Sequence, residues 1–119
     1  MPRHKVLVAD DHPDVADSLA ALLEIMGHEV RCAYDGGDAL AVDAAFSPDV
    51  VILDINMPVA DGYEVARALR ARKDGTQFII AMTGASSRET AEKAGEAGFD
   101  VHFVKPVVLD DLVALLDEL

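Results

Sequence analysis

Short apolar runs alternate along this chain with segments in which apolar residues recur every three or four positions. The clearest run is Val50 to Asp54, which is apolar up to one carboxylate and lies between Pro48 and Pro58. Such a run is typical of a strand buried on both faces, since proline cannot continue a central strand. The pattern predicts strands at 6–9, 29–33, 50–54, 78–82 and 101–104, and helices at 13–26, 39–46, 63–72, 86–97 and 108–118.

Small and polar residues mark several of the expected boundaries. Pro13 suits the first turn of a helix, and Asp35-Gly36-Gly37 is predicted to form a turn before the second helix. Ser86 or Ser87 is expected to cap the fourth helix, with Glu89 as the acidic partner in a capping box.

This strict alternation, with short connections, predicts an α/β fold in which helices cover both faces of a five-stranded parallel sheet. The chain has 119 residues, which suits a single domain at 1–119. Hydrophobic residues make up 51% of it, enough for a substantial core at this length. We see no internal repeat or linker.

Polar residues follow directly where four of the expected strands end. They are Asp10 and Asp11 after the first, Asp54 at the end of the third, Thr83 after the fourth and Lys105 after the fifth. The carboxyl ends of parallel strands lie on one edge of the sheet, where ligands bind in open α/β folds. We therefore expect these residues to face one crevice, although each by itself could be a cap, a turn residue or a solvated charge.

The chemistry of this set points to phosphoryl transfer. Two like charges about 4 Å apart repel by ~4 kcal/mol at an effective dielectric constant of about 20, so three clustered carboxylates favour a divalent cation. Mg²⁺ prefers oxygen ligands and usually shares them with a phosphoryl group. Lys105 can pair with Asp54 and then with phosphoryl oxygens, and Thr83 offers a hydroxyl donor. A carboxylate nucleophile, a metal, a lysine and a hydroxyl together make a phosphoryl-transfer site.

At these residues the chain resembles the receiver domain of a two-component response regulator. The resemblance runs from Lys5 to the end and rests on Asp10-Asp11, Asp54, Asn56-Met57-Pro58, Asp61-Gly62, Thr83-Gly84 and Lys105-Pro106. It implies the flavodoxin-like (βα)5 fold, a three-layer sandwich around a parallel sheet of strand order 2-1-3-4-5.

The resemblance also implies a role for each site residue. Asp54 would be the phosphoacceptor and a metal ligand, while Thr83 and Lys105 would bind the phosphoryl group. The further groups implied to hold Mg²⁺ are Asp11 directly, Asp10 through water, and the backbone carbonyl of Asn56.

Two histidines and one proline lie close to the predicted site in the sequence or in the expected fold. His102 stands where many receivers carry the tyrosine or phenylalanine that acts with Thr83 as a switch; it is either such a switch ring or a half-exposed polar residue on an edge strand. His12 is expected to be a solvent-facing loop residue, because Mg²⁺ selects oxygen. A cis Lys105–Pro106 bond is expected, because Lys105 must turn back toward Asp54, and the resemblance implies the same isomer.

A narrower resemblance concerns the parent protein and its partners. The segments 14–24, 27–31 and 98–106 are similar to receivers fused to hybrid sensor histidine kinases. The phosphodonor would then be a histidine kinase or a histidine phosphotransfer domain. A homodimer or effector contact is expected through the fourth helix, fifth strand and fifth helix.

Charge and cysteine content restrict the partners and the compartment. The chain carries 10 Lys and Arg against 22 Asp and Glu, a net charge of −12, which argues against direct binding to nucleic acid or an anionic membrane. Its one cysteine, Cys32, makes no internal disulfide and fits a reducing cytosol. No apolar run approaches the ~18 residues of a membrane-spanning helix. We expect a cytoplasmic domain.

Three other classes of protein fit the sequence less well than a receiver. A haloacid-dehalogenase-type phosphatase needs a second acid two residues after the nucleophile, where this chain has Asn56. A flavin- or nucleotide-binding module needs a phosphate cradle after the first strand, where Asp10 and Asp11 would repel a phosphate without a metal. The complete set of acids, threonine and lysine argues against a degenerate receiver used only for docking. We expect a domain that assists its own phosphorylation and dephosphorylation and is not a conventional turnover enzyme.

Overall fold

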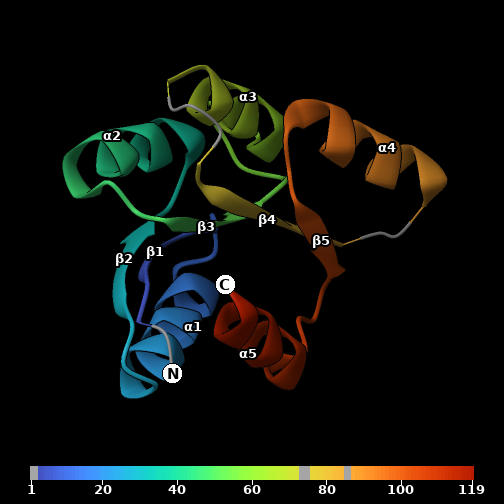
Figure 1. Cartoon of the computed structure of the whole chain (residues 1–119). Coiled ribbons are helices and arrows are strands. Elements are labelled where there is room, and N and C mark those ends of the chain that lie inside the picture. The colour runs from blue at the N-terminus through green and yellow to red at the C-terminus, as the bar shows by residue number, and fades with distance from the viewer. Residues whose placement is uncertain (1–2, 73–75, 85–86) are drawn as a thin grey trace.

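The computed structural model describes residues 3–72, 76–84 and 87–119. In this part of the chain, strands and helices alternate as the sequence predicts (Figure 1). The elements are β1 (Lys5–Ala9), α1 (Pro13–Ile25), β2 (Glu29–Ala33), α2 (Gly36–Phe46), β3 (Val50–Asp54), α3 (Gly62–Arg72), β4 (Phe78–Thr83), α4 (Arg88–Ala97), β5 (Val101–Val104) and α5 (Leu109–Glu118).

The five strands form one sheet in the order β2-β1-β3-β4-β5, and every neighbouring pair is parallel. This confirms the flavodoxin-like fold predicted from the sequence. Figure 1 shows α2, α3 and α4 on one face of the sheet and α1 and α5 on the other. Because all strands run the same way, their carboxyl ends lie along one edge, where the polar residues named above follow them.

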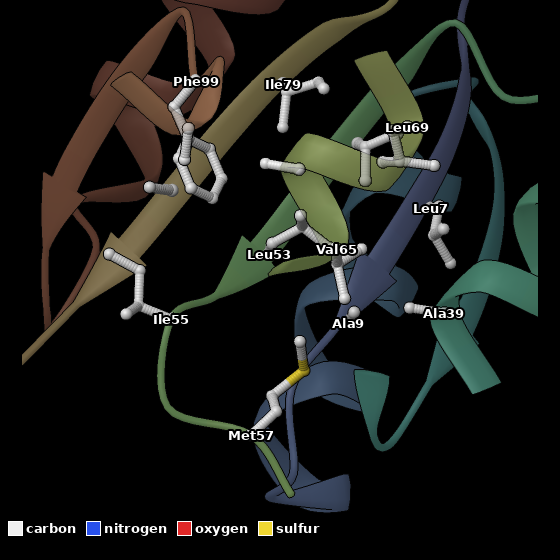
Figure 2. Close-up of a cluster of buried hydrophobic side chains, with 14 of the residues drawn as sticks. Leu7, Ala9, Ala39, Leu53, Ile55, Met57, Val65, Leu69, Ile79 and Phe99 are labelled. Carbon is white, nitrogen blue, oxygen red and sulfur yellow. The ribbon is translucent and has the colours of Figure 1, made fainter. Parts of the chain in front are cut away.

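The core has two layers, one on each side of the sheet. All five residues of β3 are buried, and they alternate between the layers: Val51 and Leu53 pack under α2, α3 and α4, whereas Val50 and Ile52 pack toward α1 and α5. Figure 2 shows the first layer, in which Met57 lies beyond the strand ends. Full burial of one such aliphatic side chain contributes about 1.5–3 kcal/mol, so the two layers stabilise the sheet that carries the polar edge.

Helix α2 begins at Gly36, three residues earlier than predicted, so the turn expected at Asp35-Gly36-Gly37 is wrong. The Asp35 side chain caps the helix, because its Oδ1 accepts a 2.7 Å hydrogen bond from the Asp38 backbone N–H. Gly36 is buried, and a Cβ there would collide with the backbone carbonyl of Ala60. The glycine therefore serves a close approach between α2 and the loop after β3.

Helix α4 also differs at its start. Ser87 is the cap, and its Oγ accepts a 3.0 Å hydrogen bond from the Thr90 backbone N–H. The capping-box role predicted for Glu89 is wrong, because Thr90 occupies the third helical position and its hydroxyl lies 2.9 Å from Ser87 Oγ. Ser86, the other predicted cap, lies outside the described residues.

A histidine pair, which the sequence did not reveal, joins α5 to the amino end of the sheet. His4 Nδ1 lies 2.7 Å from Asp49 Oδ2, and its Nε2 lies 3.0 Å from the carbonyl oxygen of Leu116 in α5. His28 stacks on His4 with ring centroids 5.5 Å apart, and its Nδ1 accepts a 3.1 Å hydrogen bond from the His4 backbone N–H. Both rings are buried, so this contact is part of the core.

Candidate functional site at the carboxyl edge of the sheet

Two buried carboxylates share one lysine at the carboxyl edge of the sheet. Lys105 Nζ donates a 3.0 Å hydrogen bond to Asp10 Oδ2 and lies 3.3 Å from Asp54 Oδ2. Asp10 follows β1 and has no exposed surface, and Asp54, the last residue of β3, is 3% exposed. The crevice predicted from the strand ends therefore brings these three side chains together.

The pKa values of Asp10, Asp54 and Lys105 are shifted by burial and by the contacts of the lysine with both carboxylates. Burial raises the pKa of Asp54, and the charge of Asp10 raises it further, against the opposing effect of Lys105. For Asp10, burial acts to raise the pKa, but a hydrogen bond from the His12 backbone N–H and the Lys105 ammonium together lower it below its usual value. Burial acts to lower the pKa of Lys105, yet the two carboxylates raise it. The lysine stays charged but cannot neutralise both acids.

The acidic cluster fits a divalent cation. Asp10, Asp11, His12 and Asp54 each offer one ligand atom, and these atoms all lie within 4.8 Å of one another. Asp11 Oδ1 is buried and accepts no hydrogen bond in the described part of the chain, although His12 Nδ1 lies 3.1 Å away. A buried carboxylate oxygen without a hydrogen bond is unfavourable, and a hard cation would satisfy it.

Two further predicted residues lie at the same edge. The Asn56 backbone N–H donates a 3.2 Å hydrogen bond to Asp54 Oδ1, so residue 56 lies directly beside the carboxylate. Thr83 ends β4, is 4% exposed, and its carbonyl oxygen accepts a 2.7 Å hydrogen bond from the Lys105 backbone N–H. The Lys105–Pro106 bond is cis, the expected isomer.

His102 lies apart from the acidic cluster. It pairs with Ala81 in the sheet and is half-buried. Its neighbours Val101 and Phe103 pack in the layer toward α1 and α5, so the alternation of a strand directs His102 to the opposite face, which α4 covers. This position fits either reading of His102 from the sequence.

His12 is exposed, as predicted, yet it also contacts the acids. Its side chain is 70% exposed, while Nδ1 lies 3.2 Å from Asp10 Oδ1 and 3.1 Å from Asp11 Oδ1. This proximity to the acids was not predicted from the sequence. The signal was its position directly after the acid pair, at the turn into α1.

The loop after β3 contains two backbone features that matter for the site. A Cβ on Gly62 would lie 2.7 Å from the Asp54 carbonyl oxygen, so the start of α3 can pack on the end of β3 only with glycine there. Val59 has a φ of 73°, a conformation that β-branched residues rarely adopt, and is 83% exposed. The Asp61-Gly62 pair marked this loop in the sequence, whereas nothing marked Val59.

An apolar groove opens beside the site, between α1 and the segment that joins β5 to α5. Its volume is about 620 Å³. The residues that line it are Val15, Leu19, Leu22, Met82, Gly84, Lys105, Pro106, Val107 and Leu109. Lys105 thus borders both the groove and the acidic cluster. On α5, Leu112 and Leu116 are fully buried, whereas Leu109 lines the groove.

The fold and this edge define a phosphoryl-accepting signalling domain of the flavodoxin-like class, and the comparisons with known proteins agree. The family model described as "Response regulator receiver domain" matches residues 6–117. The chain belongs to this family, and it is a receiver domain of two-component signalling.

Related proteins cover nearly all of this chain. The transcriptional regulatory protein PrrA of Mycobacterium tuberculosis is 44% identical over 110 residues, 92% of this chain and 47% of that protein. The response regulator MprA of Mycolicibacterium vanbaalenii is 37% identical over 110 residues, which again cover 92% of this chain and 47% of that protein. The chain therefore spans about half the length of these relatives.

Solved structures agree with the fold. The chemotaxis protein CheY4 of Vibrio cholerae has a TM-score of 0.91 at 31% identity, with 98% of each chain covered. The Francisella response regulator 1452 receiver domain has a TM-score of 0.89 at 30% identity, covering 97% of this chain and 94% of the other. The relatives named here are regulators, and the narrower resemblance to hybrid kinases stays a prediction.

Proposed function

We propose that residues 1–119 form a single receiver domain that accepts a phosphoryl group on Asp54 from the phosphohistidine of a histidine kinase or histidine phosphotransfer domain. The observation that best supports this proposal is the sharing of Lys105 between Asp10 and Asp54. It places a positive charge beside a buried carboxylate at the edge where the strands end. Among the described residues Asp10 and Asp54 both combine burial, a contact with this lysine and neighbouring acids, and Asp54 is the one that ends a buried strand.

Transfer requires Asp54 to act as the nucleophile. One oxygen of its carboxylate would form a bond to phosphorus as the bond from phosphorus to the donor imidazole nitrogen breaks, and the imidazole would leave with that electron pair. Since burial and Asp10 raise the pKa of Asp54, the positive charge of Lys105 favours the ionised, reactive form. Lys105 and the Thr83 hydroxyl would then bind the phosphoryl oxygens.

Mg²⁺ is the cofactor we propose for the acidic cluster. Its ligands would be Asp54, Asp11, the backbone carbonyl of Asn56, and Asp10 through water. When bound, Mg²⁺ offsets the negative charge of the acids and of the incoming phosphoryl group. The buried Asp11 Oδ1 supports this assignment, because it makes no hydrogen bond in the described part of the chain.

The proposed output is a change of surface. Phosphorylation would shift a two-state arrangement of Thr83 and His102, and with it the face formed by α4, β5 and α5, where an effector or a second copy would bind. The domain would assist its own phosphorylation and dephosphorylation without being a conventional turnover enzyme. We propose that it acts in the cytoplasm. No helix in the described residues is long and apolar enough to cross a membrane.

The groove beside Lys105 is the proposed docking site for the phosphodonor. The groove is apolar and adjoins the phosphoacceptor Asp54. The exposed side chain of Leu22 on α1 borders it. A helix that carries a phosphohistidine could bury its apolar face there while the imidazole reaches Asp54.

Asp54→Asn tests the acceptor directly. The amide keeps the shape of the side chain but removes the nucleophile, so the variant should gain no phosphoryl group from a small phosphodonor and Mg²⁺, as measured by intact mass. Its circular dichroism should match that of the parent. A variant that still gains one phosphoryl group would rule out Asp54 as the acceptor.

A further inference from the structure

Both nitrogens of the buried His4 ring lie against hydrogen-bond acceptors. Nδ1 is 2.7 Å from Asp49 Oδ2, and Nε2 is 3.0 Å from the carbonyl oxygen of Leu116. An ionised carboxylate and a backbone carbonyl can only accept, and a neutral imidazole carries only one N–H. A ring that donates to both partners therefore holds a proton on each nitrogen and is positively charged. Its side chain is only 8% exposed, so little water is available to replace either partner.

The ring stacked on His4 is in the opposite state. His28 Nδ1 accepts a 3.1 Å hydrogen bond from the His4 backbone N–H, so this nitrogen carries no proton and the ring is neutral. Burial lowers the pKa of His28, and the charge of His4 lowers it further, which agrees with this geometry. The ring centroids lie 5.5 Å apart at an interplanar angle of 17°. One charged and one neutral histidine thus form the pair.

The end of α5 lacks a cation of its own. The last four carbonyls of a helix have no partner inside it and carry partial negative charge, which a nearby cation stabilises. Leu116 is one of these residues, and its carbonyl oxygen also accepts a 3.3 Å hydrogen bond from the Leu119 backbone N–H. The helix contains no lysine or arginine, and Asp117 and Glu118 add negative charge to its last turn. His4, which precedes β1, places a positive charge where α5 needs one.

The other charged groups near the two rings do not serve this purpose. Asp49 Oδ1 accepts a 2.6 Å hydrogen bond from the Lys5 backbone N–H, which holds the carboxylate beside the ring. Asp117 of α5 acts on the same pair of rings, and Glu29, the first residue of β2, is exposed. The Lys5 ammonium lies over the Phe46 ring, 4.6 Å from its centre. None of these neighbours provides a cation to the end of α5.

We infer that His4 is a proton-dependent clamp on α5, in which the doubly protonated ring joins the Asp49 carboxylate to the Leu116 carbonyl. As pH rises, the ring loses one proton. A carboxylate attracts the remaining proton more strongly than a carbonyl does, so Nε2 is the nitrogen that loses it. The lone pair of Nε2 then faces the Leu116 oxygen, and the last turn of α5 loosens.

Acid opens the clamp from the other ring. A protonated His28 can no longer accept the hydrogen bond from the His4 backbone N–H, and two charged rings repel each other. The clamp is therefore closed over an intermediate range of pH. This inference goes beyond the proposed function, because it gives α5, part of the proposed output face, a second input that does not depend on phosphorylation.

The first test determines the protonation state directly, by nitrogen–hydrogen NMR of the imidazole rings of the parent. At a pH of about 7 a free histidine is mostly neutral. His4 should nevertheless show a bonded hydrogen on both nitrogens, and His28 should show one on Nε2 alone. A His4 nitrogen without a hydrogen under these conditions would overturn the inference.

The second test follows the urea midpoint of unfolding from a pH of about 7 to about 9. The folded parent holds the His4 proton and the unfolded chain does not, so the midpoint should fall as pH rises. Burial raises the pKa of Cys32 to about 11, and the hydrogen bond to Asp17 raises that of Tyr34 to about 12, so neither titrates in this range.

Two variants assign this fall to His4. His4→Gln has a neutral amide that can donate to the Leu116 carbonyl and cannot titrate, so it should lose most of the fall. His102→Gln is the matched control, because it removes a half-buried histidine outside the pair, and it should retain the fall. The same fall in the parent and in His4→Gln would contradict the clamp.

The third test locates the released segment and needs only the parent, so it holds even if His4→Gln fails to fold. The carbonyl carbon of Leu116 and the amides of residues 116–119 should shift with the same midpoint of pH as the His4 nitrogens. The amides of β3, which lie away from this contact, should not follow that midpoint. Signals at the end of α5 that stay in place while His4 titrates would show that the ring does not hold the helix.

Discussion

Lys105 and Asp10 lie 95 positions apart in the sequence, and the ammonium of Lys105 donates a 3.0 Å hydrogen bond to the Asp10 carboxylate. The same ammonium lies 3.3 Å from Asp54. One cation thus serves two buried acids, with Asp11 beside them. Without a metal the cluster carries surplus negative charge, which lowers the stability of the fold.

Removing Asp11 should therefore have opposite effects on metal binding and on stability. Asp11→Ala removes a proposed direct ligand and should weaken Mg²⁺ binding at least tenfold, as measured by calorimetry. In the presence of a chelator it should raise the free energy of unfolding by on the order of 1 kcal/mol, because it relieves like-charge repulsion. Glu24→Ala, an exposed acid of α1 away from the cluster, controls for the loss of one negative charge. Equal Mg²⁺ affinity in the parent and Asp11→Ala would refute the ligand role.

Docking of the phosphodonor can be separated from the chemistry. Leu22 lines the groove and is 42% exposed, so Leu22→Glu should slow transfer from a phosphohistidine protein at least tenfold. Transfer from a small phosphodonor, which needs no groove, should keep its rate. Ile25→Glu is the matched control, since Ile25 lies on the same helix, outside the groove lining, and is 82% exposed. Equal slowing by both variants, or slowing with the small phosphodonor, would contradict the docking role.

Helix α4 should be the least protected helix in hydrogen exchange. It buries only Ala94 and Ala97, whereas α1 buries Leu23 as well as two alanines. Less buried apolar area gives a smaller free energy of local opening. Exchange of α4 amides as slow as that of α1 would show that the prediction is wrong.

Two glycines, one in α4 and one after α1, should respond to alanine in opposite ways. Gly95 lies inside α4, and a Cβ there would meet nothing within 4 Å, so Gly95→Ala should stabilise the helix by ~1 kcal/mol and slow its exchange. Gly27 has equal room, but its φ is 99°, so Gly27→Ala should destabilise the protein by ~1–2 kcal/mol. Urea denaturation measures both. The same sign for the two variants would contradict this reasoning.

The histidine pair at the opposite edge should make stability depend on pH. Burial lowers the pKa of His28 below 6.5, the charge of His4 lowers it further, and Asp117 and Asp49 partly oppose this. The unfolded chain therefore binds a proton at His28 before the folded protein does, and the free energy of unfolding should fall as pH drops below about 6.5. His28→Asn retains an acceptor for the His4 backbone N–H and cannot titrate. Its unfolding free energy should fall less than that of the parent between pH 7.5 and about 5.5, and a parallel fall would exclude His28 as the source.

Local sequence patterns determined the order of elements and the candidate site. The apolar run that ends at Asp54 predicts a strand buried on both faces, and β3 is buried at all five positions. Alternation with short connections requires parallel strands, and parallel strands place Asp10, Asp54 and Lys105 at one edge. These conclusions need only spacing and polarity, because the period of apolar residues reflects which faces of an element are buried.

Only the tertiary structure decided contacts between segments far apart in the chain. Gly36 lies against the backbone of Ala60 at the start of α2, whereas the sequence alone predicted a turn at these residues. The contact of His4 with Leu116, the position of His12 over two acids, and the groove beside Lys105 likewise depend on distances that no local pattern contains. A residue type states what a side chain can donate, accept or bind, but its partner is set by how the helices pack on the sheet.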